Sequence, residues 1–417
     1  MTKFVKSPLS IALASALLAT TNTAMAAGFQ IGEHSAASIG RANAGDGAIA
    51  GDASVIASNP ALMTQLKQPT LSAAINYVEP DVAIDGEKTG AFASTVSQGD
   101  VVPSVVIPSI FYVHPINEKV SLGIGAFTNF GLESQYDDDF TGSEFADTAS
   151  VITININPSL AYQLNKEVSL GFGLNYLIAS AEFATSMPDV AGGDDLLSLE
   201  GDGTDLGWNA GISWQASSAT MVGFSYRSGF EVKLEGDATG LATGSTTVIR
   251  DGELVLDLPA LANLSIAHQL NDALQLSASI DYTQWSAFEK LEGDIDGIGT
   301  VHIKDEYWED SYRYSIGATY QLNPAVKLRA GLAYDESPVE AEYRSLSIPD
   351  SNRVWYSTGA NFAVNEMFDI DVAYAYIDGE EVDVTEEFNS VPGLESTFTG
   401  TSEGNANIVS VQLNTRF

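Results

Sequence analysis

The amino-acid sequence predicts an all-β membrane protein, an antiparallel transmembrane β-barrel of about fourteen strands with an N-terminal hatch, or plug, in its lumen. Three observations support this fold class. A short apolar segment of the secretory type opens the chain, apolar residues alternate with polar or small ones along most of the remainder, and short turns are interspersed with long polar loops. These features together are typical of barrels in the outer membrane of Gram-negative cells.

The composition of the 417-residue chain limits its function. There are 55 acidic residues against 18 Lys and Arg, so the formal net charge is −37. Nucleic acid is excluded as an electrostatic partner, because binding phosphates requires clustered Lys and Arg. The absence of cysteine excludes thiol catalysis, disulfide bonds and cysteine-bound zinc. We expect no cofactor and assign no residues to a specific metal site.

Residues 1–26 have the pattern of a secretory signal peptide. Lys3 and Lys6 give a positive start, residues 11–19 form an apolar core, and residues 24–26 are a small-residue cleavage site. An uncleaved membrane anchor is the alternative, but the core is shorter than the roughly 20 residues that cross a bilayer. We therefore expect the mature chain to begin at Ala27.

Apolar residues recur at every second position in many later segments. Side chains of a strand alternate between its two faces, so each segment is expected to have one apolar face and one polar or small face. The clearest segments are 120–126, 168–176, 274–282, 314–322, 326–334, 368–376 and 409–417.

Short turns divide these segments into pairs. Most of them contain Asn, which tolerates left-handed backbone geometry and bonds its own backbone in tight turns. Six turns join twelve strands between residues 103 and 377, one strand precedes them at 70–78 and one follows at 406–417, which gives about fourteen. The turns are 115–118, 163–166, 215–218, 269–272, 321–324 and 363–366.

The opposite ends of the strands carry longer loops rich in acidic residues and glycine, such as 192–195 and 200–203. Short turns at one end and long loops at the other are typical of outer-membrane barrels, with both chain ends on the periplasmic side. The alternative is a soluble secreted β-sandwich. A sandwich buries its apolar face in a core and has loops of similar length at both ends.

Residues 27–68 do not alternate and are dominated by Ala, Gly and Ser. Side chains alone fill a barrel of about eight strands, so a barrel of fourteen needs something else in its lumen. We interpret 27–68 as that hatch and 69–417 as the barrel. A disordered periplasmic tail is the alternative, but it would be more polar and would lack the turn signal of Asn59-Pro60.

The hatch and barrel motifs resemble the FadL-type long-chain fatty acid transporters. As a set, and in this order along the chain, they are specific for that family. The residues that carry the resemblance are 27–31, 40–42, Gly45, 52–53, 59–61, 129–132, 226–228, 285–288, 310–313, 335–339, Arg344, 348–350, Arg353 and Trp355. The resemblance implies a fourteen-strand barrel closed by an N-terminal hatch, in agreement with the strand count.

The resemblance also implies site residues. Phe29 would occupy an apolar ligand pocket, and Lys304 would bind the ligand carboxylate. Asn129, Phe130 and Gly131 would lie at a strand kink that forms a lateral opening in the wall. Glycine within a strand often marks such a bulge or break. The hatch motifs are Gly40, Arg41, Asn59, Pro60 and Ala61. The residues expected in a charge network of the lumen are Glu306, Arg313, Asp335, Arg344 and Arg353.

The implied function is passive uptake of long-chain fatty acids, by hatch rearrangement and lateral exit. The alternative is the uptake of neutral hydrophobic compounds such as aromatic hydrocarbons, because the stretch 178–183 lacks the family's arginine and offers Ser180. A second departure from the family pattern is the short acidic loop expected at 184–205, which in the family helps to build an outer capture groove. The expected partners are these hydrophobic small molecules, outer-membrane lipid and lipopolysaccharide, with the barrel monomeric.

Other functions fit the sequence less well. A hydrophilic porin has no hatch, and an outer-membrane enzyme would need a catalytic motif. There is no G-x-S-x-G motif, and the four histidines are scattered along the chain.

The acidic loops should repel a fatty acid anion, and we expect them to bind divalent cations shared with lipopolysaccharide.

Overall fold

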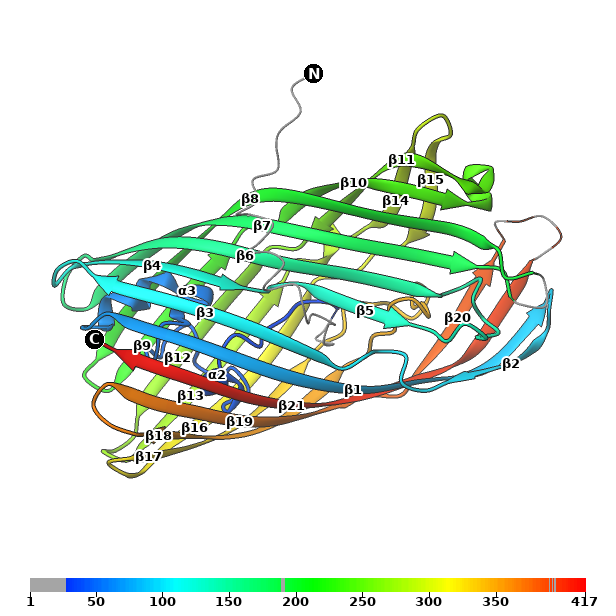
Figure 1. Ribbon diagram of the computed structural model, residues 1–417. Helices are drawn as coiled ribbons and strands as arrows, with labels where there is room; N and C mark the ends of the chain where they lie inside the picture. Colours follow the sequence, from blue (N-terminus) through cyan, green and yellow to red (C-terminus); the bar gives the residue numbers. More distant parts are fainter. Residues whose placement is uncertain (1–27, 189–191, 390, 392, 394) are drawn as a thin grey trace, which may run out of the picture.

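The computed structural model describes residues 28–188, 192–389, 391, 393 and 395–417, so the expected signal peptide lies outside the described residues. Within them, antiparallel strands form one closed barrel (Figure 1). The last strand, β21 (Ser396–Arg416), pairs with the first, β1 (Thr70–Gly90), from Thr70 opposite Arg416 to Gly90 opposite Ser396. Closure of the ring pairs the first and last strands, as a barrel in lipid requires.

The described wall has fourteen strands, some of them broken in two, which confirms the predicted number and even count. In chain order they are β1, β3 (Val105–Pro115), β4 with β5 (Val120–Phe127, Gly131–Gln135), β6 (Thr148–Gln163), β7 (Val168–Ser186), β8 (Asp195–Ser217), β9 with β10 (Thr220–Arg227, Phe230–Gly240), β11 with β12 (Ser245–Leu258, Leu261–Gln269), β13 with β14 (Leu274–Thr283, Lys290–Ile295), β15 with β16 (Gly299–Asp305, Ser311–Asn323), β17 (Val326–Asp335), β18 (Arg353–Ala363), β19 (Phe368–Gly379) and β21. Two short strands, β2 (Ser94–Gln98) and β20 (Val382–Phe388), extend the sheet at the ends of β1 and β21.

The predicted alternation places apolar side chains on the outside of the wall. Along β7, Leu170, Phe172 and Leu174 are exposed, whereas Ser169 and Asn175 are buried. An exposed apolar band around a closed barrel is stable only in contact with lipid. The outer face is therefore the membrane-facing surface. No helix among the described residues is long and apolar enough to cross a membrane.

The turn asparagines bond their own backbone as predicted, but none of those in the described turns has a left-handed φ. Asn165 Oδ1 accepts hydrogen bonds from the backbone N–H groups of Glu167 and Val168, both at 2.8 Å, and Asn117, Asn271 and Asn365 repeat this pattern. The C-terminal Phe417 lies at the same end, where its N–H donates to the Pro69 carbonyl at 3.0 Å.

The strands are longer than the sequence predicted. The first was expected to end at residue 78 but continues to Gly90, and the last begins at Ser396 instead of residue 406. The expected loop 184–205 is mostly strand, since β7 continues to Ser186 and β8 begins at Asp195. These prediction errors have one cause. Backbone ladder bonds need no apolar face, so polar segments continue the sheet above the membrane.

The N-terminal residues 28–68 pack inside the ring as short turns with α2 (Ala36–Ile39), α3 (Val55–Ser58) and η2 (Pro60–Gln65) (Figure 1). We call these residues the lumenal segment. Asn59 is fully buried and anchors it: its Oδ1 accepts from Ala61 N, and its Nδ2 donates to the carbonyls of Gly47 and Ile212.

Wall glycines make room for the lumenal segment at the motifs that the sequence singled out. A Cβ on Gly171 would lie 2.2 Å from Ala61 N, one on Gly331 2.1 Å from the Arg41 carbonyl, and one on Gly359 3.0 Å from Gly40 Cα. Backbone therefore lies directly against backbone at several points around the ring. At each of these three glycines there is no space for a side chain.

Substituting one of these glycines should displace the lumenal segment. A Cβ on Gly223 would lie 1.7 Å from the Gly47 carbonyl oxygen, so Gly223→Val introduces a backbone clash that destabilises the packing by at least about 1–3 kcal/mol. We expect a severalfold higher ion conductance in planar bilayers. Gly99→Val is the control, because nothing lies within 4 Å of its Cβ. Unchanged conductance from folded Gly223→Val would contradict this account of the packing.

Candidate functional site

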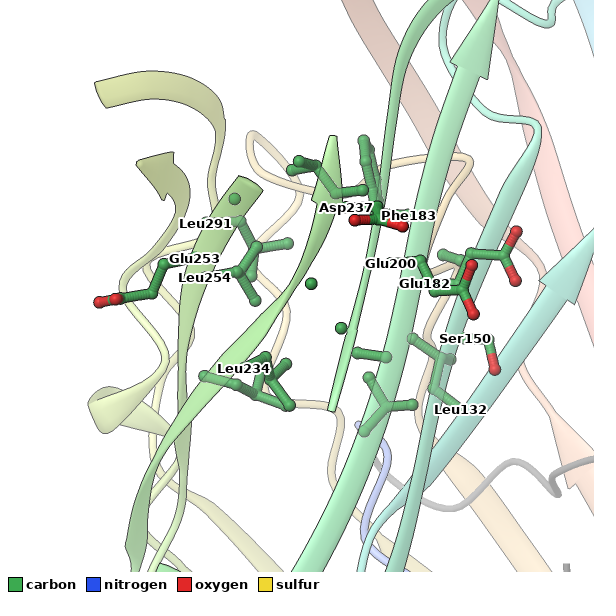
Figure 2. A pocket seen from close by; sticks show the side chains of 18 of the residues that line it. Leu132, Ser150, Glu182, Phe183, Glu200, Leu234, Asp237, Glu253, Leu254 and Leu291 are labelled. Atoms are coloured by element: carbon green, nitrogen blue, oxygen red, sulfur yellow. The ribbon is translucent and has the colours of Figure 1, made fainter. Parts of the chain in front are cut away.

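An apolar cavity lies in the upper lumen, which we define as the part between the lumenal segment and the barrel end opposite the asparagine turns. It contains about 650 Å³ of empty space, part of it open to solvent, and most of its lining is aliphatic or aromatic. Figure 2 shows Leu234, Leu254 and Leu291 on one side of the cavity and Leu132 and Phe183 on the other. The broken strands β4/β5, β9/β10, β11/β12 and β13/β14 all contribute to the lining or lie beside it. This is the environment that an alkyl or aromatic ligand requires.

The charged residues at this cavity are acidic. Glu182 and Glu200 lie opposite each other on β7 and β8, and Asp237 and Glu253 lie at the same level. Figure 2 shows the Glu253 carboxylate directed away from the cavity, and it pairs with Lys233 at 2.5 Å. Among the described residues, no Lys or Arg lines the cavity.

Phe29 closes the bottom of the apolar cavity. Its ring lies 4.6 Å from Trp285, 5.4 Å from Phe288, 5.7 Å from Trp308 and 6.3 Å from Phe130, measured between ring centroids. We call these five residues the aromatic floor. Edge-to-face pairs at such distances each contribute about 0.5–1.5 kcal/mol beyond their buried area. Phe29 is only 1% exposed, so the floor is tightly packed.

The residue before Phe29 explains how the chain reaches this position. Gly28 has a φ of +60°, a left-handed conformation that favours glycine. A Cβ there would lie 2.6 Å from the Trp285 ring and 2.7 Å from the Trp308 ring. Both the backbone turn and the space therefore require glycine at position 28.

The backbone of the lumenal segment is bonded directly to the predicted kink. Ile31 N donates to the Asn129 carbonyl at 2.7 Å, Gly131 N donates to the Phe29 carbonyl at 2.9 Å, and Gln30 and Phe130 form a β-bridge. Residues 29–31 are thus a short extra strand on the inner side of the break between β4 and β5.

The same break interrupts the wall. The strand β4 pairs with β3 as far as Ala126, opposite Ile110, whereas β5 pairs with β6 alone among the described strands. Residues 105–109 of β3 consequently have no strand partner on that side in the described part of the chain. The ladder between two neighbouring wall strands is missing beside the aromatic floor.

A second, polar cavity lies on the other side of this extra strand. It contains about 980 Å³ of empty space, part of it open to solvent, and Gln30, His34, Asn129, Arg227 and Arg313 are among its lining residues. Phe29 therefore borders the apolar cavity and the next residue borders the polar one. Burial lowers the pKa of His34 to about 4, so its ring is neutral, and its Nε2 lies 3.0 Å from the Thr128 carbonyl.

Lys304 does not line the apolar cavity. It lies on β15 opposite Leu291, which does, and its Nζ pairs with Glu386 of β20 at 2.6 Å. Ser180 does not line the cavity either. It occupies the face of β7 opposite to Ala179 and Ala181, which pack into the apolar core. Neither polar group suggested for a head group thus lies on the cavity surface.

The expected charge network is divided in space. Asp335 lies opposite Arg313 on one neighbouring strand and Arg353 on the other, and the Arg313 guanidinium stacks 4.2 Å above the Trp355 ring. Arg353 also pairs with Asp350, whose carbonyl accepts from Arg344 at 3.2 Å. Arg313 donates to the Ala42 carbonyl at 3.4 Å, which connects the network to the lumenal segment.

Glu306 lies apart from these residues, beside the aromatic floor. Its Oε2 accepts from Trp308 Nε1 at 2.9 Å. Burial raises the pKa of Glu306 to about 7, and the nearby charge of Lys304 partly opposes the shift. The group therefore titrates close to neutral pH next to the ring that packs on Phe29.

Sequence reasoning missed a row of asparagines inside the wall. Asn155 Nδ2 donates to Asn129 Oδ1 at 2.8 Å and to Asn175 Oδ1 at 2.9 Å, and Asn157 and Asn175 both donate to Asn209. Asn is depleted in strands, so its recurrence at alternate positions 155 and 157 was a usable signal. The row connects the kink with Arg227 on β9.

A closed antiparallel barrel with an apolar outer surface and a filled lumen defines an integral protein of the outer membrane. The chain belongs to the family of outer membrane transport proteins named OMPP1/FadL/TodX, whose sequence pattern matches residues 17–417. It is 34% identical to the long-chain fatty acid transport protein of Escherichia coli O6:H1 over 423 aligned residues, covering 92% of this chain and 93% of that protein. It is 32% identical to outer membrane protein P1 of Haemophilus influenzae, with 97% and 98% covered.

Solved structures share the fold. A Pseudomonas aeruginosa FadL homologue superimposes with a TM-score of 0.86 at 23% identity, covering 94% of this chain and 100% of that one. The Pseudomonas putida toluene transporter TodX superimposes with a TM-score of 0.69 at 18% identity, with 94% and 100% covered. These similarities establish the barrel architecture.

Stability should depend on the protonation of Glu306. Between pH 4.5 and 7 the folded protein holds a proton on this carboxyl that the unfolded chain has lost, so the free energy of unfolding falls as pH rises through that window. We expect Glu306→Gln to lose less stability than wild type between pH 5 and pH 8, measured by urea unfolding in lipid vesicles. Glu118→Gln, in an exposed turn, should behave as wild type. Equal pH dependence in all three proteins would contradict burial of a titrating Glu306.

Proposed function

We propose that the protein takes up long-chain fatty acids passively across the outer membrane, after export directed by residues 1–26. The observation that carries the proposal is the aromatic floor: an apolar cavity is closed by Phe29, whose backbone is bonded to the interruption in the wall. The full-length relatives named as fatty acid transport proteins support the choice of cargo.

The chemistry of a fatty acid requires an apolar route through the protein. A sixteen-carbon chain resists transfer to water by roughly 12 kcal/mol, at about 0.8 kcal/mol per CH₂, so a wet pore is unsuitable. In this mechanism the alkyl chain enters the apolar cavity and displaces Phe29 from the aromatic floor. Because the Phe29 carbonyl is bonded to Gly131 N, its movement acts directly on the break in the wall. The chain then leaves sideways into the bilayer between β3 and β5.

The lumenal segment acts in this proposal as a hatch that stays in place. Gly40, Arg41, Asn59, Pro60 and Ala61 lie against the wall or hold the segment's turns, so only its first residues need to move. Arg313, Asp335 and Arg353 fix the middle of the segment, and Arg344 and Glu306 act at the upper rim. A small displacement of residues 28–31 then suffices for gating.

A neutral hydrophobic compound, such as an aromatic hydrocarbon, is the second candidate cargo. The specific observation in its favour is that none of the described Lys and Arg side chains lines the apolar cavity. A carboxylate would find no cation there, and the nearby Glu182 and Glu200 lie on the outward faces of β7 and β8. The toluene transporter among the structural relatives has the same fold. Competition between oleate and an uncharged hydrocarbon distinguishes the two candidates.

Uptake in cells tests the route. Labelled oleate should enter a Gram-negative strain that lacks its own transporter when this protein is supplied. Gly131→Pro removes the N–H that bonds to the Phe29 carbonyl, and we expect it to reduce uptake severalfold or more. Phe29→Ala removes the closing ring and should raise basal ion conductance.

The control for both variants is Ile249→Ala, an exposed upper-strand residue outside both cavities, which should transport as wild type. No oleate uptake by a correctly inserted wild-type barrel would reject the fatty acid proposal. Uptake unaffected by Gly131→Pro would reject the lateral route.

Lys304 can bind a carboxylate only if its pairing with Glu386 opens. We therefore expect Glu386→Gln to free the ammonium and strengthen oleate binding by about tenfold, while Lys304→Ala weakens it by a similar factor. Methyl oleate binding should not change in either variant. Titration of each purified variant with oleate and with methyl oleate measures the two affinities. If Glu386→Gln leaves oleate affinity unaltered, Lys304 has only a structural role.

A further inference from the structure

Arg227 differs from the other buried arginines of the lumen. The residue is 5% exposed, and no carboxylate of the described residues forms an ion pair with it. By contrast, Arg41 pairs with Asp46, Arg329 with Asp371 and Arg353 with Asp350. A buried cation without a counter-ion is costly, since its charge is not compensated. Such a group is more stable when an anion is beside it.

The neutral partners of Arg227 connect it to the break in the wall. Its Nη1 donates to Asn175 Oδ1, its Nη2 donates to the Ala57 carbonyl at 2.9 Å, and its guanidinium lies 5.3 Å above the Phe127 ring. The same Asn175 oxygen accepts from Asn155, which also bonds to Asn129 at the kink. One chain of hydrogen bonds thus runs from the cation to the proposed exit.

Donor groups around Arg227 are available to an anion. Asn129 and Asn209 both line the polar cavity with Arg227, and within the described part of the chain their amide nitrogens form no hydrogen bond. His34 lines the same cavity and lies near the kink. Its Nε2 is within hydrogen-bond distance of the Thr128 carbonyl, and its ring packs edge-on against Phe127. A carboxylate is bound well by a guanidinium together with amide N–H donors.

The acids of this cavity lie beside other cations. Asp46 pairs with Arg41, and Asp281 and Asp335 lie opposite Arg313 on the strands that flank it. The positive charge at Arg227 is therefore not neutralised by them at close range. Within the polar cavity, the end at Arg227 is therefore the one suited to binding an anion.

We propose that Arg227, with Asn129 and Asn209, forms a transit site for the carboxylate of an amphipathic cargo. This inference rests on the proposed uptake of fatty acids through the broken wall. As the alkyl chain moves into the bilayer between β3 and β5, the head group must stay in a polar environment until the tail is free. The polar cavity provides that environment directly below the aromatic floor. An uncharged hydrocarbon has no use for the site.

A purely structural role for Arg227 makes a different prediction, because its bond to the Ala57 carbonyl holds the lumenal segment. Loss of that bond would affect every cargo equally. Loss of a carboxylate site would affect only charged cargo. The comparison of a fatty acid with its methyl ester separates the two roles.

The experiment measures uptake of labelled oleate and labelled methyl oleate by cells that carry wild type, Arg227→Gln or Arg227→Lys. Glutamine keeps hydrogen-bond donors but removes the charge, so we expect oleate uptake to fall about tenfold or more and methyl oleate uptake to stay at the wild-type rate. Arg227→Lys keeps the charge and should retain part of the oleate uptake. Arg250→Gln is the matched control, because Arg250 lies outside the polar cavity and, within the described residues, donates to the carbonyls of Thr243 and Asp296.

Equal losses of both cargoes in Arg227→Gln would overturn the proposal and assign Arg227 a structural role. Unchanged oleate uptake would overturn it as well. Failure of the proposed function itself is a separate result, recognised by the absence of oleate uptake in wild type. If wild type transports methyl oleate but not oleate, the transit site is rejected together with the fatty acid cargo.

Discussion

The pairing of residues 29–31 with residues 129–131 is the interaction on which the rest of the site depends. Two backbone hydrogen bonds and one β-bridge join the start of the lumenal segment to the break in the wall. Because this extra strand lies between the two cavities, one face of it is Phe29 in the apolar cavity and the other is Gln30 in the polar one. The same pairing of residues 29–31 with 129–131 therefore closes the apolar cavity and spans the interruption in the wall.

This arrangement separates two requirements that conflict in a simple pore. Apolar cargo needs a dry surface, whereas the interior of a wide barrel must satisfy many buried polar groups. The wall meets the second requirement with asparagine amides, serines and paired charges around the lumenal segment, and it confines the dry surface to the upper lumen. The aromatic rings of Trp285, Phe288 and Trp308 form the boundary between the two regions.

The parts of the structure that depend on local sequence were predictable. Alternation along 168–176 and the asparagine turns follow from backbone geometry, and both are present. The lengths of β1 and β8 were not predictable, because polar residues continue a ladder without an apolar face. The family resemblance drew attention to Phe29 and to residues 129–131. It did not reveal that Lys304 is paired with Glu386, which lies 82 residues away in the sequence, or that asparagines on separate strands connect the kink to Arg227.

The closing ladder between β1 and β21 has a consequence for biogenesis. It joins Thr70 to Arg416, so the last seam of the ring cannot form until almost the whole chain has arrived. Pairings between such distant residues are slow to form, and exposed strand edges persist until they do. The lumenal segment contacts strands on several sides of the ring, so its final packing requires those strands to be in place. Assembly of this protein is thus expected to depend on periplasmic chaperones that protect the open sheet.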